Sequence, residues 1–192
     1  MWAEAGVHIM QADQVAHDLM QPGQAVYREV VERFGNGILD SSGAINRAKL
    51  AESAFGHAGE KHSRVKELNQ IVHPAVIDAQ EEWLAQMARD DPQGISVVEA
   101  ALILEADLEK YFDRIVVVTC RPEQRIERWA KRTGSDHSTA KAEVARRMAA
   151  QFSEEDKIKA ADYMIDNSGT LEQAKTAAAK VLAELRAAAA LK

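Results

Sequence analysis

The chain has 192 residues, 46% of them hydrophobic and 28% charged, which is the composition of a globular domain with a sizeable core. Its net charge of −6 supplies no basic field, so we expect no nucleic-acid partner. No apolar run reaches membrane-spanning length and the N-terminus does not resemble a signal peptide, so we expect a cytoplasmic protein without a membrane partner. Its single cysteine, Cys120, excludes an internal disulfide.

The first thirteen residues predict a strand that ends on a carboxylate. Residues 1–5 resemble the end of a helix with a C-cap at Gly6, so we expect the chain to begin inside an element. Residues 7–10 favour a strand, and Asp13 follows just before a helical stretch at 14–20. An acidic residue there lies at the carboxyl edge of a sheet, where open α/β folds bind ligands. The structural alternative is that Asp13 is only a helix N-cap.

The region between the first two strands is long and mainly helical. Residues 14–92 exceed a simple crossover, so we predict a helical insertion over one end of the sheet. Inside it, residues 34–43 form a loop and residues 46–55 a helix. A new helix is predicted to start at His73-Pro74, because proline suits the first helical turn.

Three further segments favour strands. They are residues 95–104, residues 114–120, which are apolar on both faces like a buried parallel strand, and the weaker candidate 163–166. Helical segments separate most of these strands. This order predicts an α/β fold with a parallel sheet and crossover helices.

The last helix has a recognisable start. Residues 170–173 (Thr-Leu-Glu-Gln) have the pattern of a capping box. Helical spacing then predicts a stripe of apolar residues whose role is packing. The stripe consists of Leu171, Ala174, Ala178, Val181, Leu182 and Leu185.

A basic helix follows the strand at 114–120. Arg125, Arg128 and Arg132 are spaced i, i+3 and i+7, so they share one face near the carboxyl edge of the sheet. Guanidinium groups there suit phosphate binding and the stabilisation of a phosphoryl group in transfer. The alternative is a solvated basic stripe. The loop at 133–138 joins this helix to a second one, which carries Arg146-Arg147, and we predict that the pair forms a mobile flap.

Other candidate residues follow the predicted strands at the same edge of the sheet. Glu105 is a second carboxylate after a strand, and residues 166–169 form a turn whose simplest interpretation is a helix cap. The six histidines, including His57 and His62, lack metal-binding spacing, so we predict no metal site built by protein ligands. No Gly-x-Ser-x-Gly segment predicts covalent catalysis, and Cys120 is interpreted as a buried strand residue.

Taken in order, these segments resemble the dephospho-CoA kinase family. The resemblance covers essentially the whole chain, and it depends on the ordered set more than on any one motif. The matching segments are 11–13 through 21–23, 34–43 with Arg47, Leu50 and Phe55, His73-Pro74, 101–105, Arg128 and Arg132, Gln151, and 161–169.

The resemblance implies a P-loop kinase fold, a three-layer α/β/α arrangement around a parallel sheet, here with the first strand missing. It implies a helical CoA-binding insertion at residues 14–92 and lid helices at residues 122–158, with the remainder as the nucleotide core. It also implies transfer of the γ-phosphate of ATP, with Mg²⁺, to the ribose 3′-hydroxyl of dephospho-CoA. This is the last step of coenzyme A biosynthesis.

The same resemblance implies roles for individual residues. Asp13 matches the acid that orients or deprotonates the 3′-hydroxyl. Arg128 matches a lid arginine that steadies the transferring phosphate, with Arg132 nearby in the ATP site, and Asn167 falls in the turn beside the adenine. Three more residues match positions around the acceptor: Arg47, His73 and Glu105.

The chain departs from the family pattern at three places. Gln11 replaces the first aspartate of Asp-Ala-Asp, Ala101 replaces the proline of Pro-Leu-Leu, and no Gly-x₄-Gly-Lys-Ser/Thr segment is present. That segment cradles the phosphates of ATP, so we expect this chain to be inactive. Two alternatives are a non-catalytic module that binds CoA-type ligands and a P-loop kinase for another small metabolite. The sequence leaves the oligomeric state open.

Overall fold

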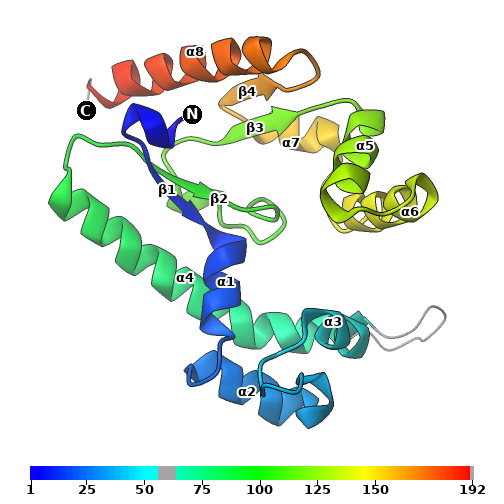
Figure 1. Cartoon of the computed structure of the whole chain (residues 1–192). Coiled ribbons are helices and arrows are strands. Elements are labelled where there is room, and N and C mark those ends of the chain that lie inside the picture. The colour runs from blue at the N-terminus through cyan, green and yellow to red at the C-terminus, as the bar shows by residue number, and fades with distance from the viewer. Residues whose placement is uncertain (56–63, 191–192) are drawn as a thin grey trace. The chain divides into compact units, whose positions relative to one another are not determined.

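A computed structural model describes residues 1–55 and 64–190 (Figure 1). It divides into two compact units. The N-terminal unit is Val7–Ala100, and the C-terminal unit combines Met1–Gly6 with Ala101–Lys192. Each unit contains one pair of parallel strands flanked by helices, and each is described below by itself.

The N-terminal unit is built on a short parallel sheet. β1 (His8–Gln11) pairs with β2 (Ser96–Glu99), and His8 is aligned with Ser96. The long helix α4 (Val65–Asp90) precedes β2 and packs against both β2 and α1 (Ala12–Leu19). The chain therefore leaves β1 directly into α1 and returns to the sheet along α4 (Figure 1).

Helices between β1 and β2 form the main core of this unit. They are α2 (Ala25–Phe34), the short 3₁₀ helix η2 (Asn36–Ile38) and α3 (Arg47–Phe55). Asn46 begins α3, since its side-chain oxygen accepts hydrogen bonds from the amides of Ala48 and Lys49. The buried side chains of the cluster come from all these helices and from α4: Val26, Val30, Phe34, Ile38, Leu50, Ala54 and Val72.

The prediction that a helix starts at His73-Pro74 is wrong. Pro74 lies inside α4, which begins nine residues earlier at Val65 and continues to Asp90. An internal proline removes the hydrogen bond to the carbonyl four residues before it, here that of Gln70. Pro74 and Gln70 are both exposed, so water can satisfy this carbonyl.

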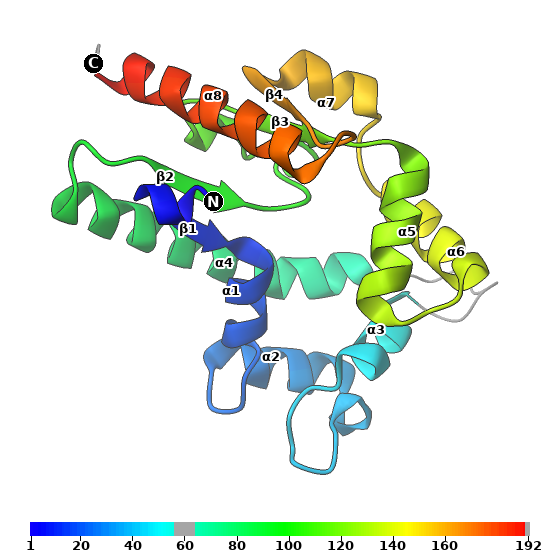
Figure 2. The same ribbon diagram turned by 45° about the horizontal axis from the view of Figure 1, so that its top comes forward.

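The C-terminal unit contains the second parallel pair. β3 (Val116–Thr119) pairs with β4 (Tyr163–Asp166), with Val116 aligned with Tyr163. The last helix, α8 (Leu171–Ala189), packs against β4, and α7 (Glu154–Ala160) packs against β3 (Figures 1 and 2). The remaining helices of this unit are η1 (Ala3–Ala5), η3 (Glu109–Tyr111), α5 (Pro122–Thr133) and α6 (His137–Met148).

The first residues of the chain pack on α8. Trp2 packs against the buried cluster of Ile165, Ala178 and Val181, and its indole N–H donates to the Ala178 carbonyl at 2.9 Å. Gly6 has a φ of +81° and ends η1, because its amide donates to the Ala3 carbonyl. The predicted glycine cap is confirmed, although the segment that it ends is a single 3₁₀ turn.

The start of α8 follows the sequence prediction, with one exception. Thr170 is the N-cap and Gln173 completes the capping box. Ala174, Ala178, Val181 and Leu182 are buried as predicted, but Leu171 is 70% exposed. Leu171 is the first residue of the helix, and burial begins one turn later.

Two strand predictions are corrected by the structure. The strand expected at 95–104 ends at Glu99, because hydrogen bonds from Ala106 to Leu102 and from Leu108 to Ile103 form a turn instead. The strand expected at 114–120 covers only Val116–Thr119, and Val118 is 58% exposed, so burial on both faces is wrong.

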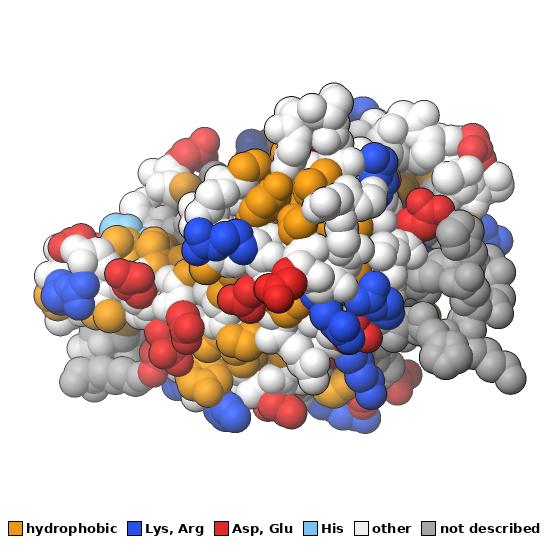
Figure 3. Space-filling view, turned by 90° about the horizontal axis from the view of Figure 1, so that it is seen from below, with side chains coloured by type: hydrophobic (Ala, Val, Ile, Leu, Met, Phe, Trp, Pro, Cys, Tyr) orange, Lys and Arg blue, Asp and Glu red, His pale blue; other side chains and the backbone are white. Residues whose placement is uncertain are grey.

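The α/β class with parallel strands is confirmed. Within the described residues the four strands hydrogen-bond as two separate pairs and not as one continuous sheet. None of the helices in residues 1–55 and 64–190 is both long and apolar enough to cross a membrane. Figure 3 shows that Lys and Arg side chains alternate with Asp and Glu side chains on one face, as the balance of 24 basic and 30 acidic residues leads us to expect.

Candidate functional site

Asp13 lies in the first turn of α1, immediately after β1. Gln11 occupies the N-cap position, so the interpretation of Asp13 as the N-cap is wrong. Asp13 is exposed, and among the described residues its carboxylate has no hydrogen-bond or ion-pair partner. A negative charge is favourable at this end of a helix, where the backbone N–H groups are unpaired. The carboxylate therefore lies at the start of the helix with its oxygens available to accept hydrogen bonds from a ligand.

Arg47 and His73 belong to the same unit as Asp13. Arg47 is the exposed first residue of α3, and His73 is half-buried on α4. Burial lowers the pKa of the His73 imidazole, so this side chain is neutral at pH 7. Because α1 and α3 both pack against α4, the three residues belong to one group of packed helices.

Glu105 has partners within the C-terminal unit. Its carboxylate accepts a hydrogen bond from the Phe152 amide at 2.6 Å, and the Lys157 ammonium lies 3.8 Å away. The Glu105 and Lys157 side chains are only 13% and 18% exposed. In this unit Glu105 therefore fixes the segment between α6 and α7, whereas Arg47 and His73 lie in the other unit.

The three arginines on α5 have three different partners. Arg125 pairs with Glu154, at the start of α7. Arg128 donates to the Asn167 carbonyl at 2.9 Å. The Arg132 guanidinium lies 4.7 Å from the centre of the Trp129 ring. Each guanidinium on this face of α5 therefore has a specific neighbour, and Arg128 and Arg132 are also exposed to solvent.

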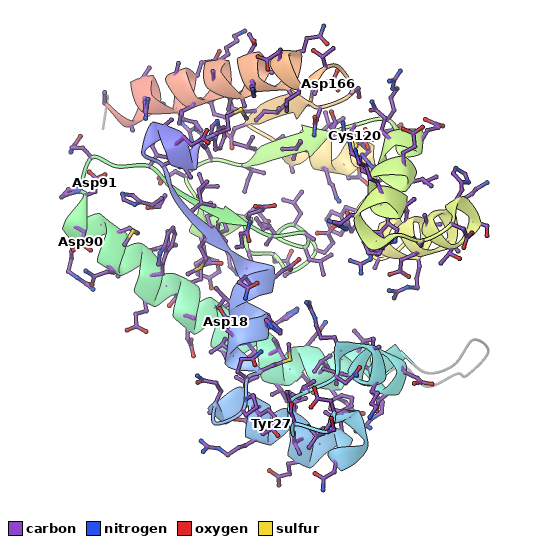
Figure 4. All side chains as sticks on the ribbon, viewed as in Figure 1. Asp18, Tyr27, Asp90, Asp91, Cys120 and Asp166 are labelled. Carbon is purple, nitrogen blue, oxygen red and sulfur yellow. The ribbon has the colours of Figure 1, made fainter. Side chains whose placement is uncertain are left out.

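The turn after β4 is fixed from several sides. The Asn167 amide donates to the Thr119 carbonyl at the end of β3, at 2.8 Å. Asp166 accepts from the Ser168 amide at 2.8 Å, and hydrogen bonds from Ser168 lower the pKa of this carboxyl. Figure 4 shows Asp166 and Cys120 at neighbouring ends of the second strand pair. Of the candidate residues, Arg128 and Asn167 are the two that the structure brings into direct contact.

Two side chains that contact this turn, those of Gln124 and Arg121, were not identified from the sequence. The Ser168 carbonyl accepts from the Gln124 side chain at 2.9 Å and from Arg121 at 3.4 Å. The available signal was spacing, since Gln124 lies one helical turn before Arg128 and so faces the same neighbour.

The predicted helix–loop–helix is formed by α5 and α6, which pack against each other. The Trp129 ring has the Arg132 guanidinium at 4.7 Å and the Arg147 guanidinium at 4.3 Å from its centre. Glu143 accepts hydrogen bonds from Arg146 and Arg147, which lower the pKa of its carboxyl to about 2. An aromatic ring binds cations, so the contact between Trp129 and Arg147 joins the two helices.

The described residues contain no group of three His, Cys, Asp or Glu side chains that could bind a metal ion. Of the six histidines, His57 and His62 lie outside the described residues. The structure thus offers single carboxylates, such as Asp13, but no metal cage in the described part of the chain.

Comparison with solved structures identifies the fold. The crystal structure of TT1252 from Thermus thermophilus matches with a TM-score of 0.72 and 26% identity, over 96% of this chain and 87% of that one. A dephospho-CoA kinase from Campylobacter jejuni matches with a TM-score of 0.63 and 21% identity, over 97% and 88% of the two chains. The fold is that of the P-loop kinases.

Sequence comparison defines the family. The model of the dephospho-CoA kinase family matches residues 1–173. Dephospho-CoA kinase from Corynebacterium glutamicum is 35% identical over 180 residues, which cover 94% of this chain and 86% of the relative. The enzyme from Aquifex aeolicus is also 35% identical, over 96% of this chain and 88% of the relative. The chain belongs to the dephospho-CoA kinase family, whose members are ATP-dependent transferases of coenzyme A biosynthesis.

Proposed function

We propose that this chain has the acceptor site of a dephospho-CoA kinase, which receives the ribose 3′-hydroxyl for transfer of the ATP γ-phosphate. The observation that carries the proposal is the family match over residues 1–173. The unpartnered carboxylate of Asp13 directly after β1 agrees with it.

On the acceptor side, Asp13 binds the 3′-hydroxyl of dephospho-CoA. Its carboxylate accepts the hydroxyl proton while the oxygen forms a bond to the γ-phosphorus and the bond from that phosphorus to the β,γ-bridging oxygen breaks. Arg47 is exposed and permanently charged, so it suits an anionic part of the acceptor. His73 is neutral and contributes hydrogen bonding without charge.

On the donor side, Arg128 steadies the transferring phosphate, Arg132 lies close to ATP, and Asn167 lies beside the adenine. Phosphoryl transfer depends mainly on positioning and on positive charge around the phosphate oxygens. The contact between Arg128 and the Asn167 carbonyl supports this assignment, because it joins the two donor-side candidates. Glu105 is a supporting residue, since its partners are a backbone amide and Lys157.

Mg²⁺ in such sites is usually bound by substrate phosphates, waters and one or two carboxylates. No cluster of three potential metal ligands is found among the described residues, so the protein can offer Mg²⁺ only isolated carboxylates there. We therefore propose that Mg²⁺ accompanies ATP, and we assign it no protein ligand.

The 192 residues contain no Gly-x₄-Gly-Lys-Ser/Thr segment. That segment supplies the backbone amides, the lysine and the hydroxyl that cradle the phosphates of ATP and bind Mg²⁺. We therefore propose that a polypeptide of these 192 residues binds dephospho-CoA but does not phosphorylate it.

Calorimetric titration of this polypeptide with dephospho-CoA, followed by a product assay with ATP and Mg²⁺, tests both statements. We expect saturable binding of one dephospho-CoA per chain and no formation of coenzyme A. A cooperatively folded chain without dephospho-CoA binding would contradict the proposed acceptor site. Turnover comparable with that of the Aquifex aeolicus relative would contradict the statement on phosphorylation.

A further inference from the structure

Helix α5 holds the turn after β4 by two consecutive backbone carbonyls. The Gln124 side chain donates to the Ser168 carbonyl at 2.9 Å. One helical turn later, Arg128 donates to the Asn167 carbonyl, also at 2.9 Å. The two donors are four residues apart, so they lie on the same face of the helix.

Both polar atoms of the Gln124 side-chain amide form hydrogen bonds. Its nitrogen donates to the Ser168 carbonyl, and its oxygen accepts a hydrogen bond from the Arg121 backbone amide at 3.3 Å. The partner of each atom fixes the orientation of the amide, because the N–H groups must meet the carbonyl and the oxygen must meet the N–H. Gln124 therefore links the first turn of α5 to the turn after β4.

Gln124 is better suited to order this turn than its neighbours are. It is half-buried, whereas Arg121 and Arg128 are exposed. A neutral side chain bears no charge that must be desolvated when it is fixed against a backbone carbonyl. The Arg121 guanidinium is also more distant from the Ser168 carbonyl, at 3.4 Å.

We propose that Gln124 is a positioning residue of the nucleotide site. By fixing the Ser168 carbonyl it sets the place of Asn167, and because it lies on α5 it fixes Asn167 relative to Arg128. This inference rests on the proposed function, which places Asn167 beside the adenine and Arg128 at the phosphate. It adds that one helix face aligns the two ends of ATP.

The variant Gln124→Glu isolates the bond to Ser168. It keeps an oxygen that can accept from the Arg121 amide, but it replaces the donor with an oxygen that repels the Ser168 carbonyl. Gln124→Met removes both bonds at similar size and serves if the acidic variant does not fold. The matched control is Glu127→Gln, the converse change at an exposed position of the same helix.

Two readouts test the inference: hydrogen exchange of the Asn167 and Ser168 amides, and ATP affinity from NMR titration of the ¹⁵N-labelled chain. For Gln124→Glu we expect about fivefold faster exchange and about fivefold weaker ATP binding, which corresponds to the net loss of one hydrogen bond. Dephospho-CoA binding and the control variant should be unchanged.

Unchanged exchange at Asn167 and Ser168 in both Gln124 variants would overturn the inference. Faster exchange with unchanged ATP affinity would overturn the role in nucleotide binding. If the wild-type chain binds dephospho-CoA but not ATP, the role of Gln124 in nucleotide binding is overturned. If it binds neither ligand, the proposed function fails as well, and the exchange rates alone then decide whether Gln124 holds the turn.

Discussion

Glu143 on α6 accepts hydrogen bonds from two arginines of its own helix. Arg146 donates to it at 2.7 and 2.9 Å and Arg147 at 2.9 Å. Arg147 also lies over the Trp129 ring of α5. The carboxylate thus orients an arginine that packs against the neighbouring helix, so its ionisation affects how the hairpin is held together.

The stability contribution of Glu143 should depend on pH in a defined window. The hydrogen bonds lower its pKa in the folded state from 4.5 to about 2. A lowered carboxyl pKa stabilises the fold fully above pH 4.5, and this contribution is lost as the pH falls through the folded-state value. We expect the difference in unfolding free energy between the wild type and Glu143→Gln to be constant from pH 6 to 8.

Denaturant unfolding at a series of pH values measures this difference. It should shrink below the ordinary pKa of 4.5 and vanish near the lowered value of about 2. A difference that stays constant down to that pH would show that the carboxylate charge does not contribute. No change between the two proteins at neutral pH would contradict the importance of the Arg146 and Arg147 contacts.

At the scale of residues, sequence reasoning identified side chains but not their partners. Arg128 and Asn167 are 39 positions apart, and nothing local in the sequence indicates that the first donates to the carbonyl of the second. The partners of Gln124 are backbone atoms, which every residue has, so only its spacing from Arg128 pointed to this turn. Contacts of this kind depend on how β3 and β4 align the elements that follow them.

At the scale of elements, α8 offers an internally controlled test of packing. Of its three leucines, Leu182 is 5% exposed and Leu171 is 70% exposed. Leu182→Ala should lower the free energy of unfolding by about 2–5 kcal/mol, because truncation of a buried leucine side chain leaves a cavity. Leu171→Ala should change it by no more than about 0.5 kcal/mol.

Chemical denaturation of both variants, with the far-UV signal as the probe, measures this contrast. The two substitutions share the same chemistry and the same helix, so propensity effects largely cancel between them. Equal losses of stability would contradict the burial of Leu182 and the exposure of Leu171 that the structure describes.

Elements with local signals were predicted well from the sequence. The capping box of Thr170 and Gln173 and the glycine cap at Gly6 involve residues within a few positions of each other, and both are confirmed. Pro74 was misread because its preference for a first turn is weaker than the tertiary packing of α4. The strand after residue 95 was overextended, since an apolar run alone does not distinguish a strand from a buried turn.

At the scale of the whole molecule, the candidate residues are divided between the two compact units. Asp13, Arg47 and His73 belong to the N-terminal unit, whereas Glu105 and the ATP-site candidates belong to the C-terminal unit. The parallel α/β class was predictable from the alternation of strands and helices, and the structural matches agree with it. The division into two strand pairs was not predictable, because pairing between distant strands leaves no local pattern in the sequence.

The proposed role of Asp13 makes a prediction about which ligand the chain prefers. Coenzyme A carries a 3′-phosphate where dephospho-CoA carries a hydroxyl, so a carboxylate at this position repels the product and accepts a hydrogen bond from the substrate. Like charges about 4 Å apart cost roughly 1 kcal/mol even in water, which corresponds to about fivefold in affinity. Asp18 lies on the same helix, and its carboxylate accepts a hydrogen bond from the Gln14 side chain. The substitution Asp18→Asn is therefore the matched control, because it removes a charge from the same helix (Figure 4).

The most direct measurement is the ratio of dissociation constants for coenzyme A and dephospho-CoA in the wild type, Asp13→Asn and Asp18→Asn, all by calorimetry. Wild type and Asp18→Asn should both favour dephospho-CoA, and Asp13→Asn should lower this preference by about fivefold. The same ratio in all three proteins would contradict the placement of the ribose 3′-hydroxyl at Asp13.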